Sequence, residues 1–296
     1  MIIVSLIYNI EVNVINGYDP KTNKYPYPLN TDEHYLVVKK DNGLVFDKDY
    51  PYIDKSFWHN FMRRLIYAVI FLIVFPLTYI RLGLKIYGKN NLKKNKKLLK
   101  GGAITMANHV HMWDYLSVMN AVKPRRPYLF VWDKNIKGEM SFVIRMVGGV
   151  PIPENDIEGS KAFTDAICNA LNGGHLVHIY GEGSMWEYYR PIRPFKTGAA
   201  YYAIKTNKPI IPMAFSYRKP GWIRRKLFHQ IALFNLHIGE PILSEGNSPE
   251  ELTKKVHEEI CRLAGIQNNL YNAIYHHDKR IDYYTSEYGI GYKGSK

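Results

Sequence analysis

The chain has 296 residues, which is the length of one large domain or two small ones. Hydrophobic residues make up 46% of the chain and aromatic residues 14%, enough to bury a sizeable core, so wholesale disorder is excluded. Two cysteines, Cys168 and Cys261, are too few for a disulfide scaffold or a cysteine-based zinc module. Forty Lys and Arg against 26 Asp and Glu give a net charge of +14, which predicts an anionic partner, either nucleic acid or an anionic membrane surface.

The first part of the chain indicates an N-terminal arm, residues 1–56. Its first ten residues lack the basic flank of a secretory signal, and polar residues interrupt their apolar character early. The rest of the arm is polar and rich in turn-forming residues, so we expect loose structure with one short strand near Tyr35–Lys39.

An apolar segment follows the arm. From Leu65 to Ile80, sixteen residues carry no charge. A helix of that length spans roughly 24 Å, which is less than the roughly 30 Å of a bilayer's hydrocarbon core, and Pro76 is expected to kink or end it. We therefore predict a membrane-embedding helix that is interfacial or re-entrant rather than a simple transmembrane span. A buried core helix is the soluble alternative.

Aromatic and basic residues flank this apolar segment. Phe57, Trp58, Arg63 and Arg64 precede it. Eight basic residues follow it, with no Asp or Glu among them: Arg81, Lys85, Lys89, Lys93, Lys94, Lys96, Lys97 and Lys100. Aromatic belts and unopposed basic stretches suit a surface of anionic headgroups, where each cation contributes about 1 kcal/mol. We therefore predict that residues 57–88 form a membrane-associated helical segment. Basic residues on both sides of it leave the topology open, and we expect the protein at the cytoplasmic face of a membrane.

From Gly101 onward, short apolar runs alternate with helical stretches. The predicted strands are 103–107, 128–132, 176–180, 209–215 and 231–238, and the predicted helices are 157–172, 196–206 and 249–266. Alternation of this kind predicts an α/β fold with a mixed, mostly parallel sheet flanked by helices. We assign residues 89–266 to this domain and residues 267–296 to a C-terminal tail.

The densest group of chemically active residues is the segment from Asn108 to Asp114. It follows the predicted strand 103–107, at the edge where doubly wound sheets place their active sites. If His109 lies on the turn and Asp114 in the first turn of a helix, the carboxylate can bond one imidazole nitrogen and leave the other as a general base. The motif has no protein nucleophile, so the base would deprotonate a substrate hydroxyl or amine.

A second motif, Gly181-Glu182-Gly183-Ser184, ends the predicted strand 176–180. Two glycines around a Glu permit close approach of the backbone to a ligand. The purely structural alternative is a tight turn with a solvent-exposed Glu. The motif is not a nucleophile elbow, because G-x-S-x-G would need glycines where Glu182 and Trp186 stand, and this disfavours a serine hydrolase.

Two later segments indicate structure rather than chemistry when taken alone. Residues 194–200 open a helix. The apolar strand that follows carries Pro209 and Pro212, which predict an edge strand or a bulge.

Together and in this order, the motifs resemble the glycerolipid acyltransferase superfamily, typified by lysophosphatidic acid acyltransferases. The matching blocks are N-H-x4-D at 108–114, Gly-Gly-Val-Pro-Ile-Pro at 148–153, G-E-G-S at 181–184 and the proline-containing strand around Pro212. The resemblance covers roughly residues 85–245, with the apolar segment in the position of that family's membrane-embedding helices.

The resemblance implies a membrane-associated O-acyltransferase. Such an enzyme moves a fatty acyl group from an acyl thioester to the hydroxyl of a lysophospholipid or related lipid, such as 1-acylglycerol-3-phosphate. His109 would then be the general base and Asp114 would orient it, with no metal or cofactor required. The acyl donor would be acyl-CoA or acyl-carrier protein, and Pro212 would lie on the acyl-donor side. The acceptor would contact the third block: Glu182, Gly183 and Ser184.

Two arginines of the family pattern are absent. The second block usually ends in an Arg that contacts the acceptor's phosphate, and Asn155 and Asp156 follow that block here. The third block also lacks its usual Arg. Three nearby cations could take over the phosphate through charge-assisted bonds: Arg190, Arg193 and Lys196. The general reaction is therefore expected, whereas the acceptor lipid stays open.

Three alternatives remain at this stage. The His109-Val110-His111 sequence with Asp114 permits a metal-dependent hydrolase, although His175 and His178 would point to opposite faces of their strand. The net charge permits a nucleic-acid-binding protein, although the basic residues cluster beside the apolar segment. A catalytically inactive, membrane-associated protein with an acyltransferase-like domain is the third.

Overall fold

The computed structural model of the protein describes residues 13–14, 36–37, 41–187, 189, 192–228, 230 and 232–265. Most of the predicted N-terminal arm, the C-terminal tail 267–296 and Arg190 lie outside the described residues. Two short strands of the arm, β1 (Asn13–Val14) and β2 (Leu36–Val37), pair antiparallel.

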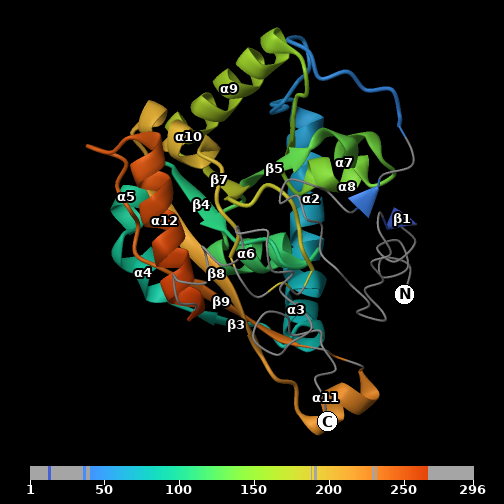
Figure 1. The fold of residues 1–296 in the computed structure, drawn as a ribbon. Helices are drawn as coiled ribbons and strands as arrows, with labels where there is room; N and C mark the ends of the chain where they lie inside the picture. The colour runs from blue at the N-terminus through green and yellow to red at the C-terminus, as the bar shows by residue number, and fades with distance from the viewer. Residues whose placement is uncertain are drawn as a thin grey trace, which may run out of the picture.

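A seven-stranded sheet forms the centre of the protein (Figure 1). Its strands are β3 (Lys85–Tyr87), β4 (Ala103–Ala107), β5 (Tyr128–Trp132), β6 (Gly149–Ile152), β7 (Leu176–Tyr180), β8 (Ile210–Arg218) and β9 (Leu233–Ile238). Their order across the sheet is β3-β9-β8-β4-β7-β5-β6, and every neighbouring pair is parallel except β8 and β9. The predicted mixed, mostly parallel sheet is therefore confirmed. β3 falls inside the segment 57–88 that we predicted to be helical and membrane-associated.

Helices cover both faces of this sheet. They are α4 (Lys89–Lys94), α5 (Lys96–Lys100), α6 (Asp114–Val122), α7 (Asp133–Lys137), α8 (Ser141–Met146), α9 (Ile157–Asn172), α10 (Gly198–Thr206), α11 (Trp222–Leu227) and α12 (Pro249–Ala264). Residues of β4 alternate between two cores: Ile104 and Met106 pack with α9, α10 and α12, whereas Ala103 and Ala107 pack with α5 and α6. This two-residue period is the one expected of a central strand buried on both faces.

The apolar segment is longer than predicted. α2 (Phe57–Val69), a π-helical segment η2 (Ile70–Val74) and α3 (Phe75–Arg81) form one continuous helix of 25 residues, long and apolar enough to cross a membrane. Pro76 does not end it. In η2 the Phe75 N–H reaches back five residues to Ile70, and this wider turn directly before Pro76 accommodates the proline ring.

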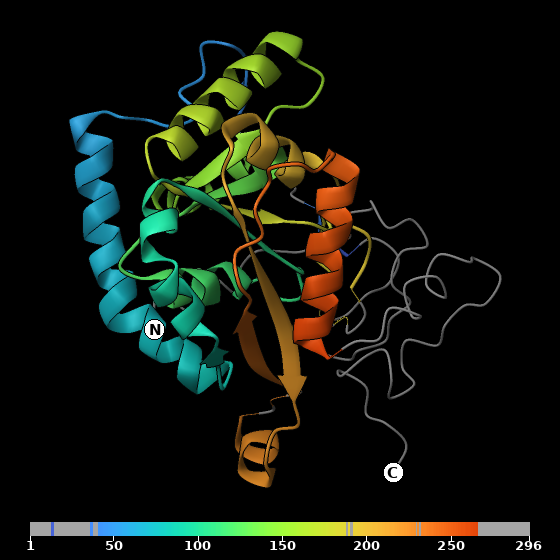
Figure 2. The ribbon, with the colours of Figure 1, turned by 90° about the vertical axis from the view of Figure 1, so that its left-hand side faces the viewer.

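This helix lies along one side of the domain (Figure 2). Its first half is attached by Tyr67, whose hydroxyl donates to the Arg125 carbonyl at 3.1 Å, and its last turn by Thr78, whose hydroxyl accepts from Asn120 at 3.2 Å. Only 22% of its apolar 18-residue window is buried, so it is not the buried core helix of the soluble alternative. Its outward face carries exposed apolar side chains: Phe57, Trp58, Phe61, Leu65, Val69, Phe71, Leu72, Ile73, Tyr79 and Ile80.

The edge-strand prediction for the segment around Pro212 is wrong, because β8 lies between β4 and β9. The carbonyl of Pro212 accepts the N–H of Gly239 at 2.9 Å, and the ladder with β9 begins one residue later, at Met213. The nitrogen of a strand residue faces the same side as its carbonyl. The nitrogen of Pro212 therefore faces a position beyond the end of β9. Its missing N–H group has no ladder partner there, so no hydrogen bond of the sheet is lost.

Candidate active site

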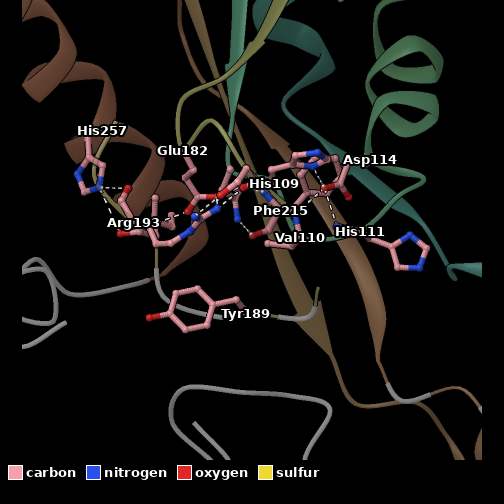
Figure 3. A network of polar contacts seen from close by, with 12 residues as sticks. His109, Val110, His111, Asp114, Glu182, Tyr189, Arg193, Phe215 and His257 are labelled. Atoms are coloured by element: carbon pink, nitrogen blue, oxygen red, sulfur yellow. Dashed lines mark hydrogen bonds and ion pairs between the residues drawn. The ribbon is translucent and has the colours of Figure 1, made fainter. Parts of the chain in front are cut away.

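The two chemical motifs meet at one edge of the sheet. β4 and β7 are parallel neighbours, paired from Ala103–Leu176 to Ala107–Tyr180, so the loops after their carboxyl ends lie side by side. The first loop carries His109 and the second carries Glu182. Figure 3 shows both loops and the polar contacts that join them.

His109 and Asp114 are in contact, as their spacing predicted. The His109 Nδ1 lies 3.2 Å from the Asp114 Oδ2, and Asp114 is the first residue of α6. The same carboxylate oxygen accepts the backbone N–H groups of Val110 at 2.6 Å and His111 at 2.8 Å. Asp114 therefore fixes the backbone of the loop as well as the imidazole, and it leaves the Nε2 of His109 as the nitrogen that can take a proton.

The surroundings of His109 favour a neutral ring. Burial lowers the pKa of its imidazole well below the usual value, and the nearby carboxylate of Glu182 opposes this only in part. The ring stacks on Tyr180 with centroids 3.7 Å apart, yet 22% of the side chain stays exposed. Burial raises the pKa of Asp114, and its two backbone N–H bonds act against that rise. A neutral, reachable imidazole is the form that a general base requires.

Glu182 faces the protein interior, which contradicts the alternative of a solvent-exposed Glu. Its side chain is 2% exposed. One carboxylate oxygen accepts the backbone N–H of His109 at 2.8 Å, and the other accepts the backbone N–H of Arg193 at 2.8 Å. Glu182 thus joins the loop after β4 to the segment that precedes α10. Its predicted part in acceptor binding stays a prediction.

Arg193 is enclosed, so the structure gives it a position unlike that of a phosphate ligand. Its side chain is 1% exposed, and its Nη2 lies 3.4 Å from the Glu182 carboxylate. The guanidinium also donates to the hydroxyl of Ser184 at 2.8 Å and to that residue's carbonyl, and it lies 4.2 Å from the ring centroid of Trp186. Ser184 is buried by the same contacts. Arg193, which the sequence suggested as a phosphate ligand, instead stabilises the turn formed by Gly181–Ser184.

Lys196 has the exposed position that Arg193 lacks. Gly183 is exposed and has a φ of +77°, and a Cβ at that position would lie 3.0 Å from the Cε of Lys196. The Lys196 backbone N–H donates to the Gly181 carbonyl at 2.8 Å, which fixes the start of its side chain over the turn. Arg190 lies outside the described residues. Pro212 is buried within β8 near Gly239, and its assignment to the acyl-donor side stays a prediction.

Two further residues support the site, and the sequence alone does not assign them this role. Asn108 exchanges two hydrogen bonds with the backbone of Phe215 in β8, at 3.2 and 2.8 Å, and so fixes the start of the His109 loop. Tyr180 forms the stacking floor under His109. Asn108 belongs to the 108–114 motif, and its position directly before His109 is the sequence feature that could have indicated this role. No pattern in the sequence indicated the stacking of Tyr180.

The metal-site alternative does not fit the histidine geometry. The Nδ1 of His111 accepts the N–H of Trp113 at 3.0 Å, and its Nε2 lies 3.6 Å from the carboxylate of Glu187. Its ring therefore points away from His109, as Figure 3 shows. Within the described part of the chain, no three potential ligands from His, Cys, Asp and Glu gather around a common point.

Two comparisons with known proteins give a match. Residues 83–216 match the family model described as Acyltransferase, and the match contains the His109–Asp114 and GEGS motifs. This match covers a little under half of the chain. Among solved structures, it is similar to the 1-acyl-sn-glycerophosphate (LPA) acyltransferase PlsC from Thermotoga maritima, with 22% identity and a TM-score of 0.45 over 60% of this chain and 69% of that one. No curated protein sequence matches the chain significantly.

The enclosed guanidinium of Arg193 leads to a first prediction. Arg193→Met leaves the buried Glu182 carboxylate without its countercharge, so the free energy of unfolding should fall by about 3–5 kcal/mol. Lys161→Met removes an exposed cation from α9 and should change that free energy by no more than about 0.5 kcal/mol. Denaturant unfolding of both variants checks this. Equal losses would show that the Glu182–Arg193 pair contributes no more than a surface charge.

Buried His178 leads to a second prediction. Its Nδ1 lies 2.8 Å from the Thr105 hydroxyl, and burial lowers its pKa to about 3. Between pH 6.5 and 3 the unfolded chain therefore binds a proton at this position that the folded protein does not, so stability falls as the pH falls. His178→Phe should reduce that slope by up to about 1.4 kcal/mol per pH unit. Unfolding free energies of both proteins at several pH values below 6.5 measure it, and identical slopes would contradict it.

Proposed function

We propose that this protein is a membrane-associated O-acyltransferase. It transfers a fatty acyl group from an acyl thioester, acyl-CoA or acyl-carrier protein, to the hydroxyl of a lysophospholipid or related lipid. The observation that carries the proposal is the neutral, partly exposed imidazole of His109, held by Asp114 within the residues that match the Acyltransferase family model. The chemistry fits the absence of a nucleophile from the motif, because the acceptor hydroxyl itself attacks.

The proposed reaction proceeds through one tetrahedral intermediate. The Nε2 of His109 takes the proton of the acceptor hydroxyl as its oxygen bonds to the thioester carbonyl carbon. Collapse of the intermediate breaks the C–S bond, and the thiolate leaves with the proton that His109 holds. Asp114 accepts from Nδ1 throughout, which orients the ring and stabilises the imidazolium that forms. The ester and the free thiol account for all atoms of the two substrates.

The acceptor's phosphate, if it has one, must find cations other than the family's usual arginines. Arg193 is committed to Glu182 and Ser184. Lys196 lies exposed over Gly183 at the same turn, so we propose it, together with Arg190, as the counterion of a phosphate-bearing acceptor. A 1-acylglycerol-3-phosphate-like lipid is the acceptor class that this arrangement favours.

We further propose that the helix α2–η2–α3 lies in the plane of the membrane. Both of its halves are bonded to the domain, through Tyr67 and Thr78, and exposed apolar side chains run along its outward face from Phe57 to Ile80, beside the exposed cations Arg64 and Arg81. A helix that crossed the bilayer would carry the attached domain into the hydrocarbon, so embedding in one leaflet accounts for both observations. The active-site edge would then lie at the cytoplasmic face, where anionic lipids attract the basic residues.

α11 extends this proposed membrane surface. It lies at the tip of the β8–β9 hairpin (Figure 1). Because β8 is parallel to β4, this tip lies at the sheet edge where the loop of His109 follows β4. The Arg224 guanidinium and the Gln230 amide donate to the Ile80 carbonyl at 2.9 and 3.2 Å, which ties α11 to the end of α3. Four exposed apolar side chains project there beside Arg225 and Lys226: Trp222, Ile223, Leu227 and Phe228. Apolar side chains with basic neighbours suit an anionic bilayer.

The proposed mechanism predicts the effect of removing the base. His109→Ala should lower the rate constant of acyl transfer by at least about 100-fold, because general-base catalysis contributes about 10²–10⁴-fold. Asp114→Asn should also lower it, since the amide no longer stabilises the imidazolium. His237→Asn, which lies in β9 outside the site, should keep the rate of the unmodified protein. The measurement uses one labelled acyl donor with a panel of lipid acceptors and mass spectrometry of the products.

Retained turnover in His109→Ala would overturn the mechanism. Absence of product from the unmodified protein with every acceptor would instead favour the catalytically inactive alternative. In the same panel, the protein could acylate monoacylglycerol in preference to 1-acylglycerol-3-phosphate. That result would contradict the proposal that Lys196 and Arg190 bind the acceptor's phosphate.

The α11 surface gives its own prediction. Trp222→Gln with Leu227→Gln should lower the partition coefficient onto phosphatidylcholine–phosphatidylglycerol vesicles by at least about tenfold, because each buried apolar side chain is worth about 1.5–3 kcal/mol. Leu243→Gln removes an exposed apolar side chain from another surface and should leave partitioning unchanged. Vesicle co-sedimentation measures all three proteins. Equal partitioning of the double variant and the unmodified protein would exclude α11 from the membrane surface.

A further inference from the structure

A cavity of about 890 Å³ opens at the sheet edge opposite His109. Its wall includes Tyr128 at the start of β5 and His175 and Leu176 at the start of β7, together with parts of α2, α9 and residues 48–55. β7 runs from this edge to the active-site edge, and its five residues span roughly 16 Å. The cavity is therefore separate from the proposed acyl-transfer site.

Positive charge dominates the wall of this cavity. It is lined by six Lys and Arg residues against two carboxylates, Asp54 and Asp165. The six are Lys48, Lys55, Arg63, Arg64, Arg125 and Arg126. In the part of the chain that the structure describes, none of the six forms an ion pair with a carboxylate. Among the described residues, the wall therefore keeps an excess of positive charge over the two carboxylates.

Neutral groups hold the inner arginines in place. The Nη2 of Arg63 donates to the Pro127 carbonyl at 3.2 Å, and its guanidinium lies 4.4 Å from the ring centroid of Tyr128. Arg125 donates to the carbonyls of Leu99 at 2.7 Å and Gly174 at 2.6 Å. Carbonyl groups orient a guanidinium without cancelling its net charge. These two side chains are thus fixed in the cavity wall and keep their positive charge.

The cations act on one another across the cavity. Burial lowers the pKa of the Arg126 guanidinium, and Arg63 and Arg64 lower it further. Burial also lowers the pKa of His175, and the same cluster adds to that effect through Arg63, Arg125 and Arg126. Mutual repulsion of this kind costs stability unless an anion is bound.

We propose that this cavity is a binding site for a phosphate-bearing ligand. Arginine guanidinium groups match phosphate oxygens in geometry and charge, and the cavity volume lies within the range of small-molecule sites. The phosphate could belong to a lipid headgroup or to a soluble compound, since α2 carries both the inward Arg63 and the exposed Arg64 at the proposed membrane surface. The site does not depend on the proposed acyl transfer.

The first test is titration of the full-length protein in neutral detergent with inorganic pyrophosphate, measured by calorimetry. Arg64→Gln with Arg126→Gln should weaken binding by at least about tenfold, because two charge-assisted contacts are lost. Lys96→Gln with Lys97→Gln removes two cations from another surface and should leave the affinity unchanged. His109→Ala, although inactive in the proposed mechanism, should bind pyrophosphate like the unmodified protein.

The result that overturns the proposal is an absence of saturable binding, or equal weakening in both double variants. Arg64 is exposed and has no hydrogen-bond partner in the described residues, so the single variant Arg64→Gln keeps the test decisive if the double variant does not fold. It should bind pyrophosphate severalfold more weakly. A purely structural role for these arginines predicts reduced thermal stability with unchanged affinity, which would also overturn the proposal.

A competition experiment separates the two sources of phosphate. Short-chain phosphatidic acid should displace pyrophosphate if the ligand is a lipid headgroup, and coenzyme A without an acyl chain should displace it if the ligand is soluble. Displacement by either compound, lost in the Arg64→Gln with Arg126→Gln variant, supports the site and assigns the source. Failure of both compounds to displace pyrophosphate would refute a phosphate-ester site.

Discussion

The buried carboxylate of Glu182 is the interaction on which the geometry of the candidate site depends. It accepts the backbone N–H groups of His109 and Arg193 and pairs with the Arg193 guanidinium, so three separate segments meet at one anion. Breaking such a pair by removing one partner is costly, because the remaining charge stays buried. Asp114 is likewise a buried carboxylate that accepts two backbone N–H groups, here within a single loop. Two enclosed carboxylates thus position an imidazole whose own surroundings keep it neutral.

Much of the domain follows from local pattern. The strands β4, β5 and β7 and the helix α9 begin and end at the predicted residues, because apolar runs bounded by turn formers leave few alternatives. The contact of His109 with Asp114 followed from the same reasoning. Short elements such as β3 and β6 were missed, since three or four residues carry too little periodicity.

The errors arose where tertiary contacts overrule local preference. Pro76 stands inside a helix because the π-helical segment before it widens the turn, and Pro212 stands inside a central strand because its neighbour ends there. The sequence predicts that Arg193 contacts the acceptor's phosphate, because it is a cation close to the position where the family's usual arginine is absent. Arg193 is buried because Glu182, Ser184 and Trp186 of the preceding turn contact its side chain. Such contacts cannot be inferred from the order of residues in the sequence.

The position of the helix α2–η2–α3 has a consequence for biosynthesis. It precedes every strand of the seven-stranded sheet in the chain, whereas its partners Asn120 and the Arg125 carbonyl come later. The ribosome therefore synthesises the apolar helix before the α/β domain to which its inner side will bind. If that surface enters a bilayer at once, the α/β domain assembles against the membrane, and the lipid acts as a template for the orientation in which folding ends.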